Sequence, residues 1–511
     1  MALRTKGTTA ADLVAQGLRG TTPQENLRQR VLEQLPLLEE QGIGIQGLYP
    51  NTLLDEEPLR AMTTSILAGH NTLLFGPSGS GKTSLAKDLW RLMPKEVWVI
   101  QGDPLQTDPF SLIDARYYER SPPSPWAKVT YGGVGLTNLG DFDPSAVDPA
   151  AVPVVSVRLH EGHGFARVQG SSEVFPDNLT GTINLRRLEE RGDPTDPLVL
   201  EPGKLLQANR GVLVIDEVGK LPIGTQNVLL QALQERTVTP AKSRETFPAC
   251  FVTVATSNMD DLDAITEPLN DRLANVYVGF SMDPVLNRAI VDGWLGSNPA
   301  PVFLPAMLID AAVEVVLAWR AVAGETFELS EVGSNRTLVD ISARATAFTQ
   351  LRRGGSVSLT DFREACLASL LSHARARGGD AHLRDKEALT SFLDQQLPLS
   401  LRRSALAYWC RFFEGPLKGD RKAALAMLER GRQLRPDDDA STLLPQFVSF
   451  VSSEEPHAAG LPPGLRAAAV FGMLVTLEAF ETDSARAAAT SSGASAAPPA
   501  APKARKPKGD R

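Results

Sequence analysis

The sequence contains little cysteine and no excess of positive charge. Three cysteines, Cys250, Cys366 and Cys410, occur in 511 residues. A disulfide scaffold is therefore excluded, and the lack of any C-x-x-C pair argues against a structural zinc site. Lys and Arg total 52 against 60 for Asp and Glu, which gives a net charge of −8. Because phosphate-coating proteins need a basic surface, we expect no nucleic-acid partner.

Long hydrophobic runs are also missing. No apolar segment approaches the roughly 20 residues that a membrane span requires, and the N-terminal stretch, which contains Asp12, lacks the apolar core of a secretory signal. Hydrophobic residues still make up 42% of the chain, enough to build large buried cores. We therefore expect a soluble, cytoplasmic protein without a membrane span.

The hydrophobic pattern changes along the chain, and at about 150 residues per domain the length predicts two to four folded units. Short apolar, β-branched runs predict buried strands at 71–75, 211–215 and 251–255. Helical periodicity covers 1–40, 306–376 and 386–480. Residues 98–200 are rich in Gly, Pro and Asp, which indicates a strand with irregular or hairpin insertions. Residues 482–511 lack aromatics and predict a disordered tail.

The strongest local motif is Gly76-Pro-Ser-Gly-Ser-Gly-Lys-Thr83, which fits G-x-x-x-x-G-K-[ST] between a predicted strand and a predicted helix. Glycines allow backbone N–H groups to converge on phosphate oxygens, and the helix N-terminus adds positive potential. We expect Lys82 to reach the β- and γ-phosphates and Thr83 to offer its hydroxyl to Mg²⁺. The predicted phosphate-binding residues are Gly76, Pro77, Ser78, Gly79, Ser80, Gly81, Lys82, Thr83 and Ser84.

Two further segments place polar residues after predicted strands. Asp216 and Glu217 follow the strand at 211–215, where Asp216 is expected to hold Mg²⁺ and Glu217 to activate a water molecule. Asn258 follows the next strand and is a candidate to position that water. Taken alone, the acid pair is compatible with a helix cap and the asparagine with an ordinary turn.

Arg272 lies fourteen residues beyond Asn258, in Glu267-Pro-Leu-Asn-Asp-Arg-Leu273. An arginine at this point of the chain is a candidate finger that stabilises transition-state charge at a neighbour's ATP, which requires a ring of subunits. A surface ion pair is the alternative for an arginine considered alone.

In their order along the chain, these segments resemble the AAA+ ATPases, and within them the magnesium-chelatase subunit I (ChlI/BchI) and MoxR-like group. The segment from Val174-Phe-Pro-Asp-Asn-Leu to Val214-Ile-Asp-Glu217 is similar to the stretch that leads into the family's second Walker motif. Ser334-Asn-Arg336 is similar to the start of the family's sensor-2 helix. The resemblance covers roughly residues 45–376, while residues 98–170 and those after 380 have no recognised counterpart.

The resemblance implies an α/β fold, with a P-loop AAA+ parallel sheet core, a helical lid and an added α-helical domain. Asp216 and Glu217 would form Walker B, Asn258 sensor 1, Arg272 the finger and Arg336 sensor 2. The expected domains are an N-terminal helical segment (1–44), the core (45–290, with insertions at about 98–200), the lid (300–378), the α-helical C-terminal domain (386–480) and the tail (482–511).

The function implied by the resemblance is hydrolysis of ATP with Mg²⁺ in a homo-oligomeric ring, expected as a hexamer, which remodels or activates a separate partner protein. A partner with a von Willebrand-type domain is one candidate. It would be a separate chain, since no D-x-S-x-S metal site follows a strand in this chain. Two alternatives stay open. One is the ATPase motor subunit of a magnesium or cobalt chelatase, and the other is a nucleotide-gated binding module with little turnover.

Overall fold

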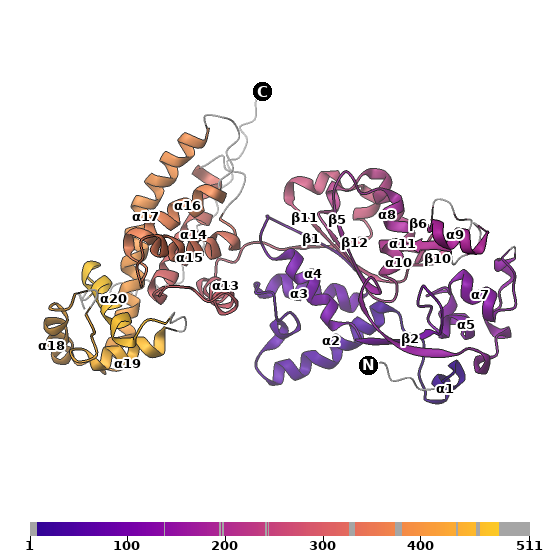
Figure 1. Ribbon diagram of the computed structural model, residues 1–511, viewed down its shortest axis with the longest axis horizontal. Helices are drawn as coiled ribbons and strands as arrows, with labels where there is room; N and C mark the ends of the chain where they lie inside the picture. Colours follow the sequence, from indigo (N-terminus) through magenta and orange to yellow (C-terminus); the bar gives the residue numbers. More distant parts are fainter. Residues whose placement is uncertain are drawn as a thin grey trace, which may run out of the picture. The chain divides into compact units, whose positions relative to one another are not determined.

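The computed structural model describes residues 8–479 with short gaps (Figure 1). The gaps are residues 137, 194–195, 197–198, 241–242, 244, 327–332, 374–380, 436–437 and 456–459. The chain divides into two compact units after Leu286. The predicted tail at 482–511 lies outside the described residues.

The first unit is built on a sheet in which every neighbouring pair of strands is parallel, in the order β12-β1-β11-β8-β5-β4. Its strands are β1 (Asn71–Phe75), β4 (His160–Glu161), β5 (Gly164–Gln169), β8 (Val212–Asp216), β11 (Val252–Ser257) and β12 (Leu273–Tyr277). The sheet confirms the predicted α/β class. Because the strands run parallel, their carboxyl ends meet along one edge.

Both faces of this sheet are buried, which explains the nearly continuous apolar strands. Leu74, Val214 and Val254 point to one face, where they pack against residues of α2, α3 and α4. Leu73 and Leu213 point to the other face, toward residues of α10, α11 and α12. The alternation of successive side chains between faces follows from the two-residue repeat of a strand.

The helices of the first unit begin with recognisable signals. Thr22 and Glu25 form a capping box at the start of α2, with Pro23 in the first turn. Gly69, in the left-handed conformation, ends α3. The helices are α1 (Ala10–Ala15), α2 (Pro23–Glu40), α3 (Glu56–Ala68), α4 (Lys82–Leu92), α5 (Phe110–Ile113), α6 (Ala115–Tyr118), α7 (Pro125–Tyr131), α8 (Pro176–Thr180), α9 (Leu185–Arg191), α10 (Lys204–Gln207), α11 (Ile223–Glu235) and α12 (Glu267–Asn270).

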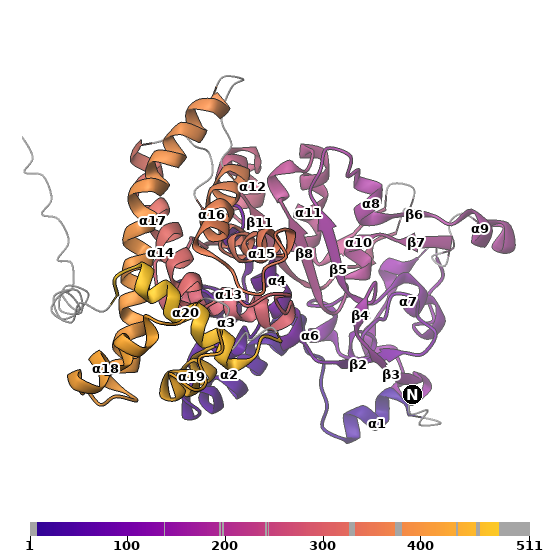
Figure 2. The same ribbon diagram turned by 60° about the vertical axis from the view of Figure 1, so that its left-hand side comes forward.

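The region at 98–200 contributes more to the core than the sequence predicted. Its segment β5 is a strand of the central sheet and pairs with β8. The rest forms additions to the core: β2 (Glu96–Ile100) pairs antiparallel with β3 (Val154–Arg158), and β6 (Gly181–Ile183) pairs antiparallel with β7 (Leu200–Pro202). Figure 2 shows α9 at the end of the arm that β6 and β7 make. A short hairpin, β9 (Thr237–Val238) with β10 (Phe247–Pro248), precedes β11.

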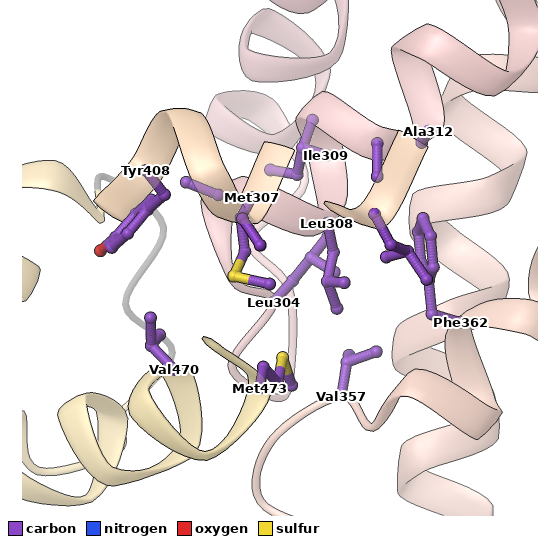
Figure 3. Close-up of a cluster of buried hydrophobic side chains, with 14 of the residues drawn as sticks. Leu304, Met307, Leu308, Ile309, Ala312, Val357, Phe362, Tyr408, Val470 and Met473 are labelled. Atoms are coloured by element: carbon purple, nitrogen blue, oxygen red, sulfur yellow. The ribbon is translucent and has the colours of Figure 1, made fainter. Parts of the chain in front are cut away.

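The second unit is helical. Its helices are α13 (Pro284–Ser297, which crosses the division between the units), α14 (Ala306–Thr326), α15 (Asn335–Leu351), α16 (Leu359–His373), α17 (Ala381–Glu414), α18 (Arg421–Gly431), α19 (Pro445–Glu454) and α20 (Pro463–Thr476). Helices from the predicted lid and from the predicted C-terminal domain share one hydrophobic core. Figure 3 shows part of it, with the side chains of Leu304, Met307, Leu308, Ile309, Ala312, Val357, Phe362, Tyr408, Val470 and Met473.

None of the described helices combines the length and the apolar character that crossing a bilayer demands.

Candidate functional site

The loop after β1 has a backbone conformation that residues with a side chain rarely adopt. Gly76 has φ 150°, Gly79 has φ 77° and Gly81 has φ 105°, all in the range that favours glycine. A Cβ atom on Gly76 would lie 2.2 Å from the carbonyl oxygen of Val278. The glycines of the motif are therefore required by the shape of the loop, which curves from the end of β1 into the first turn of α4.

Lys82 lies beneath this loop at the start of α4, with its side chain largely buried. Its Nζ donates to the carbonyl oxygens of Gly76, at 2.9 Å, and Pro77, at 2.7 Å. A third bond joins Nζ to Oδ1 of Asn258 at 3.3 Å. The ammonium group is thus held at the mouth of the loop, where the N-terminus of α4 adds positive potential.

The loop also contains an unused donor. The hydroxyl of Ser80 is buried and has no hydrogen-bond partner among the described residues. A buried hydroxyl without a partner costs free energy, so such a group usually indicates a missing ligand or water. Together with the glycine backbone and Lys82, this donor fits a bound phosphate chain.

Asp216, the last residue of β8, is buried beside the loop. Its Oδ1 accepts hydrogen bonds from Oγ1 of Thr83 at 2.9 Å and from Oγ1 of Thr256 at 3.4 Å. Mg²⁺ in proteins is held by one or two such oxygens together with phosphate oxygens and water. Among the described residues no group of three or more His, Cys, Asp or Glu side chains is placed to hold a metal ion. Thr83 and Asp216 therefore fit an ion that arrives with a phosphate ligand.

Glu217 follows in a left-handed conformation, with φ 56°. Its backbone N–H donates to Oγ1 of Thr256 at 3.0 Å, which helps to hold this uncommon conformation. The carboxylate accepts from Nδ2 of Asn258 at 3.4 Å and from Nζ of Lys220 at 3.0 Å. The sharp turn after β8 thus presents Glu217 to the same space as Lys82 and Asn258.

The fold therefore brings together five of the residues singled out in the sequence, here called the polar cluster: Lys82, Thr83, Asp216, Glu217 and Asn258. They lie at the carboxyl ends of β8 and β11 and at the start of α4, beyond the loop that follows β1. These three strands are neighbours in the sheet. Ligand sites of open parallel sheets lie at this edge.

Sequence reasoning missed two residues at this site, Arg167 and Gln169, which lie on β5 next to β8. Nε of Arg167 donates to Oδ2 of Asp216 at 2.6 Å. Nε2 of Gln169 donates to Oε2 of Glu217 at 3.1 Å, and Gln169 is the register partner of Asp216. No motif marks them. Their one sequence signal is the alternation of polar Arg167 and Gln169 with apolar Ala166 and Val168, which is typical of a strand.

Arg272 and Arg336 belong to neither the phosphate loop nor the polar cluster. Arg272 is exposed and precedes β12, at the end of the sheet opposite the phosphate loop. Its guanidinium donates to the carbonyl oxygen of Pro268 and to Oε1 of Gln234. Arg336 lies on α15 in the second unit. The roles expected for both residues remain predictions.

Comparison with known proteins finds one family model and several curated relatives that are similar to part of this chain. The model of the PrkA AAA domain matches residues 69–283. The chloroplastic magnesium-chelatase subunit ChlI-1 of Arabidopsis thaliana is 26% identical over 231 residues, which cover 44% of this chain and 46% of that protein. Subunit ChlI of Pyropia yezoensis is 27% identical over 254 residues, covering 48% of this chain and 62% of the relative. The chain thus spans about half the length of the first of these relatives.

Solved structures give a weaker likeness. A chain from a model of the complex between magnesium-chelatase subunits BchI and BchD aligns with a TM-score of 0.32 and 20% identity, over 66% of this chain and 98% of that one. NtrX from Brucella abortus aligns with a TM-score of 0.38 and 16% identity, over 77% of this chain and 70% of that one.

Proposed function

Because this chain carries an AAA+ ATPase domain related to magnesium-chelatase subunit I, we propose that it binds ATP with Mg²⁺ at the polar cluster and hydrolyses it. The observation that carries the proposal is that Lys82, Asp216 and Glu217 lie together at one edge of the parallel sheet. They lie beside a loop whose backbone leaves no room for a side chain at Gly76.

Each member of the polar cluster has a chemical task in this proposal. Lys82 and the backbone of the loop hold the β- and γ-phosphates. Thr83 and Asp216 hold Mg²⁺, which neutralises charge on the phosphates when it is bound. Glu217 accepts a proton from the attacking water, and Asn258, bonded to both Lys82 and Glu217, fixes the position of that carboxylate.

The proposal extends to a ring of subunits that acts on a separate protein. Arg272 is exposed and lies at the end of the sheet opposite the polar cluster of its own chain, so we propose that it acts on a neighbouring subunit's ATP. Hydrolysis would then move the helical unit relative to the sheet domain and remodel a bound partner. A ring of six and a partner with a von Willebrand-type domain are the specific forms that we propose.

A second function is favoured by the relatives that the comparisons name. Magnesium-chelatase subunits align with about half of this chain, which makes a chelatase motor the alternative. Proteins that co-purify with the Glu217→Gln variant discriminate between the two. A large chelatase subunit identified by mass spectrometry would favour the chelatase motor, and a partner unrelated to tetrapyrroles would favour general remodelling.

The decisive experiment is the Glu217→Gln variant of the full chain. Because glutamine cannot accept the proton of the attacking water, phosphate release should fall at least about 100-fold. Binding of a fluorescent ATP analogue should stay within about threefold of wild type, since Lys82 and the loop are untouched.

The matched control is Glu173→Gln, which removes an exposed carboxylate outside the polar cluster and should leave both quantities unchanged. Turnover of Glu217→Gln within tenfold of wild type would contradict the role of Glu217. If the wild-type chain binds ATP but does not hydrolyse it, even with its partner present, the protein is a nucleotide-gated binding module and not an ATPase.

A further inference from the structure

We infer that Arg167 is a built-in counter-ion of Asp216 that competes with Mg²⁺, and that it therefore sets the Mg²⁺ concentration at which nucleotide binds. The inference rests on the proposed function, because it concerns the same site. It assigns a role to a residue that no motif in the sequence indicates.

The contact between the two side chains is close and double. Nε of Arg167 lies 2.6 Å and its Nη2 lies 2.5 Å from the same oxygen, Oδ2 of Asp216. The other oxygen, Oδ1, accepts from the hydroxyls of Thr83 and Thr256. Both oxygens of this carboxylate are therefore engaged within the protein.

The burial of Asp216 makes its ion pair with Arg167 important for stability. The side chain of Asp216 is 5% exposed, and that of Arg167 is 40% exposed. A carboxylate buried without a partner is costly, so the guanidinium stabilises Asp216 before any ligand arrives. A Mg²⁺ ion held by Thr83 and Asp216 would lie close to this fixed positive charge, and the two cations repel each other.

Because Arg167 is partly exposed, its guanidinium can leave Asp216 when Mg²⁺ binds. Because its outer surface faces solvent, the guanidinium can move away from Oδ2 into water at a modest cost. Nη2 also donates to Oε1 of Gln169 at 3.4 Å, and Gln169 in turn donates to Glu217 at 3.1 Å. A movement of Arg167 is therefore transmitted to the second acidic residue as well.

The test compares nucleotide binding with and without Mg²⁺ in the full chain. A fluorescent ADP analogue is titrated in EDTA, and Mg²⁺ is then titrated at a fixed, subsaturating concentration of the analogue. The Arg167→Gln variant lacks the competing charge, so its Mg²⁺ midpoint should fall by about fivefold, a typical coupling between two sites. Its affinity for the analogue in EDTA should stay within twofold, because Arg167 holds Asp216 and no phosphate.

Two further variants complete the design. Arg186→Gln removes an arginine of α9 that is 87% exposed and pairs with Glu190, and its Mg²⁺ midpoint should equal that of wild type. Arg167→Lys keeps the positive charge, so its midpoint should lie closer to wild type than that of Arg167→Gln. Circular dichroism shows whether each variant is folded. If Arg167→Gln does not fold, Arg167→Lys still tests the inference.

The outcomes separate this inference from the proposed function. A Mg²⁺ midpoint of Arg167→Gln that is unchanged or higher, in a chain whose wild type binds the analogue, overturns the inference alone. Affinity lost in EDTA also overturns it, because Arg167 would then contact phosphate. A wild-type chain that binds no nucleotide under either condition overturns the proposed function, and the inference with it.

Discussion

Gly76 connects β1 to the phosphate loop in a conformation that other residues rarely adopt. Its φ of 150° and the carbonyl oxygen of Val278, 2.2 Å from the position of a Cβ atom, exclude any side chain. The N–H of Val278 also donates to the carbonyl oxygen of Phe75 at 2.8 Å, so this backbone contact is part of the sheet. The loop and the edge strand β12 are therefore coupled at a single residue.

We predict that Gly76→Ala loses both stability and ligand binding. The added methyl group forces the loop and the end of β12 apart, which should cost about 3 kcal/mol. Hydrogen–deuterium exchange of β1 and β12 peptides should accelerate, and binding of a fluorescent ATP analogue should weaken at least about tenfold. Gly224→Ala, on α11 with open space around the Cβ position, should be neutral or slightly stabilising. Equal behaviour of the two variants would refute the argument.

At the scale of elements, the strands β2 and β3 and their short helices are fastened to the sheet by a buried ion pair. Arg210, just before β8, lies 2.9 Å from Oδ2 of Asp108, and both side chains are buried. The hydroxyl of Tyr117 donates to the same carboxylate oxygen at 3.0 Å. Burial raises the pKa of Asp108, while the charge of Arg210 acts in the opposite direction.

We predict that Asp108→Asn detaches this addition from the sheet. Arg210 keeps its charge but loses its counter-ion in a buried site, which should cost about 3 kcal/mol. Calorimetry should show the unfolding midpoint of the first unit lowered by several degrees. The control is Asp141→Asn, an exposed acid in the same region, with an expected change within about 0.5 kcal/mol. If Asp108→Asn destabilises the protein no more than the control does, the ion pair between Asp108 and Arg210 does not hold this addition to the sheet.

In the helical unit, Glu455 joins three helices. It follows α19, and its carboxylate accepts from the N–H of Ala306 at 2.7 Å, at the start of α14, and from the hydroxyl of Tyr408 on α17 at 3.0 Å. Burial raises the pKa of Glu455 to about 7. The two hydrogen bonds and Arg288 act in the opposite direction, and Asp310 acts with the burial.

This shift predicts a stability that falls as the pH rises. The pKa of Glu455 is higher in the folded chain than its ordinary value near 4.5, so the folded unit gains from protonation at low pH and loses that gain between about pH 4.5 and 7. The loss amounts to about 3 kcal/mol. Calorimetry between pH 5.5 and 8 should show a falling midpoint for this unit, and Glu455→Gln should flatten the dependence.

Glu314 contributes in the same direction, because burial also raises its pKa to about 7. Part of the pH dependence should therefore remain in Glu455→Gln and disappear in the double variant with Glu314→Gln. A midpoint that rises over the same pH range in the wild-type chain would contradict the assignment.

At the scale of the whole molecule, the arginine that the family resemblance singles out is not part of its own chain's polar cluster. Arg272 precedes β12, whereas the phosphate loop follows the opposite end of the neighbouring strand β1. Its contacts to Pro268 and Gln234 are exposed. A catalytic role therefore requires a second subunit.

We predict that Arg272→Ala lowers turnover about 100-fold or more while nucleotide affinity changes little. Mixing it with Lys82→Ala subunits, which lack the phosphate-binding ammonium but keep Arg272, should restore activity. In a random equal mixture about a quarter of the sites combine an intact Lys82 with a neighbour's Arg272, so about a quarter of the wild-type rate is expected. Phosphate release by each subunit alone and by the mixture measures this. No recovery on mixing would show that Arg272 acts within its own chain or only structurally.

Local sequence was sufficient for the elements that carry their own pattern. The strands at 71–75, 211–215 and 251–255 and the glycine loop were predicted because buried strands and a phosphate loop have local signatures. The sequence did not identify β5 as a strand of the sheet, because its short alternating run is surrounded by Gly- and Pro-rich segments. Arg167 and Gln169 were missed for the same reason.

The sequence by itself predicted a phosphate-binding loop and a nearby acidic pair, because Gly76, Lys82, Asp216 and Glu217 belong to short segments with local signatures. Only the tertiary structure decided which residues act together, since pairing of β5 with β8 brings Arg167 onto Asp216 across 49 positions of sequence. It also decided that helices from the predicted lid and C-terminal domain share one core. Contacts between distant segments depend on how the strands and helices pack, and no local pattern encodes that packing.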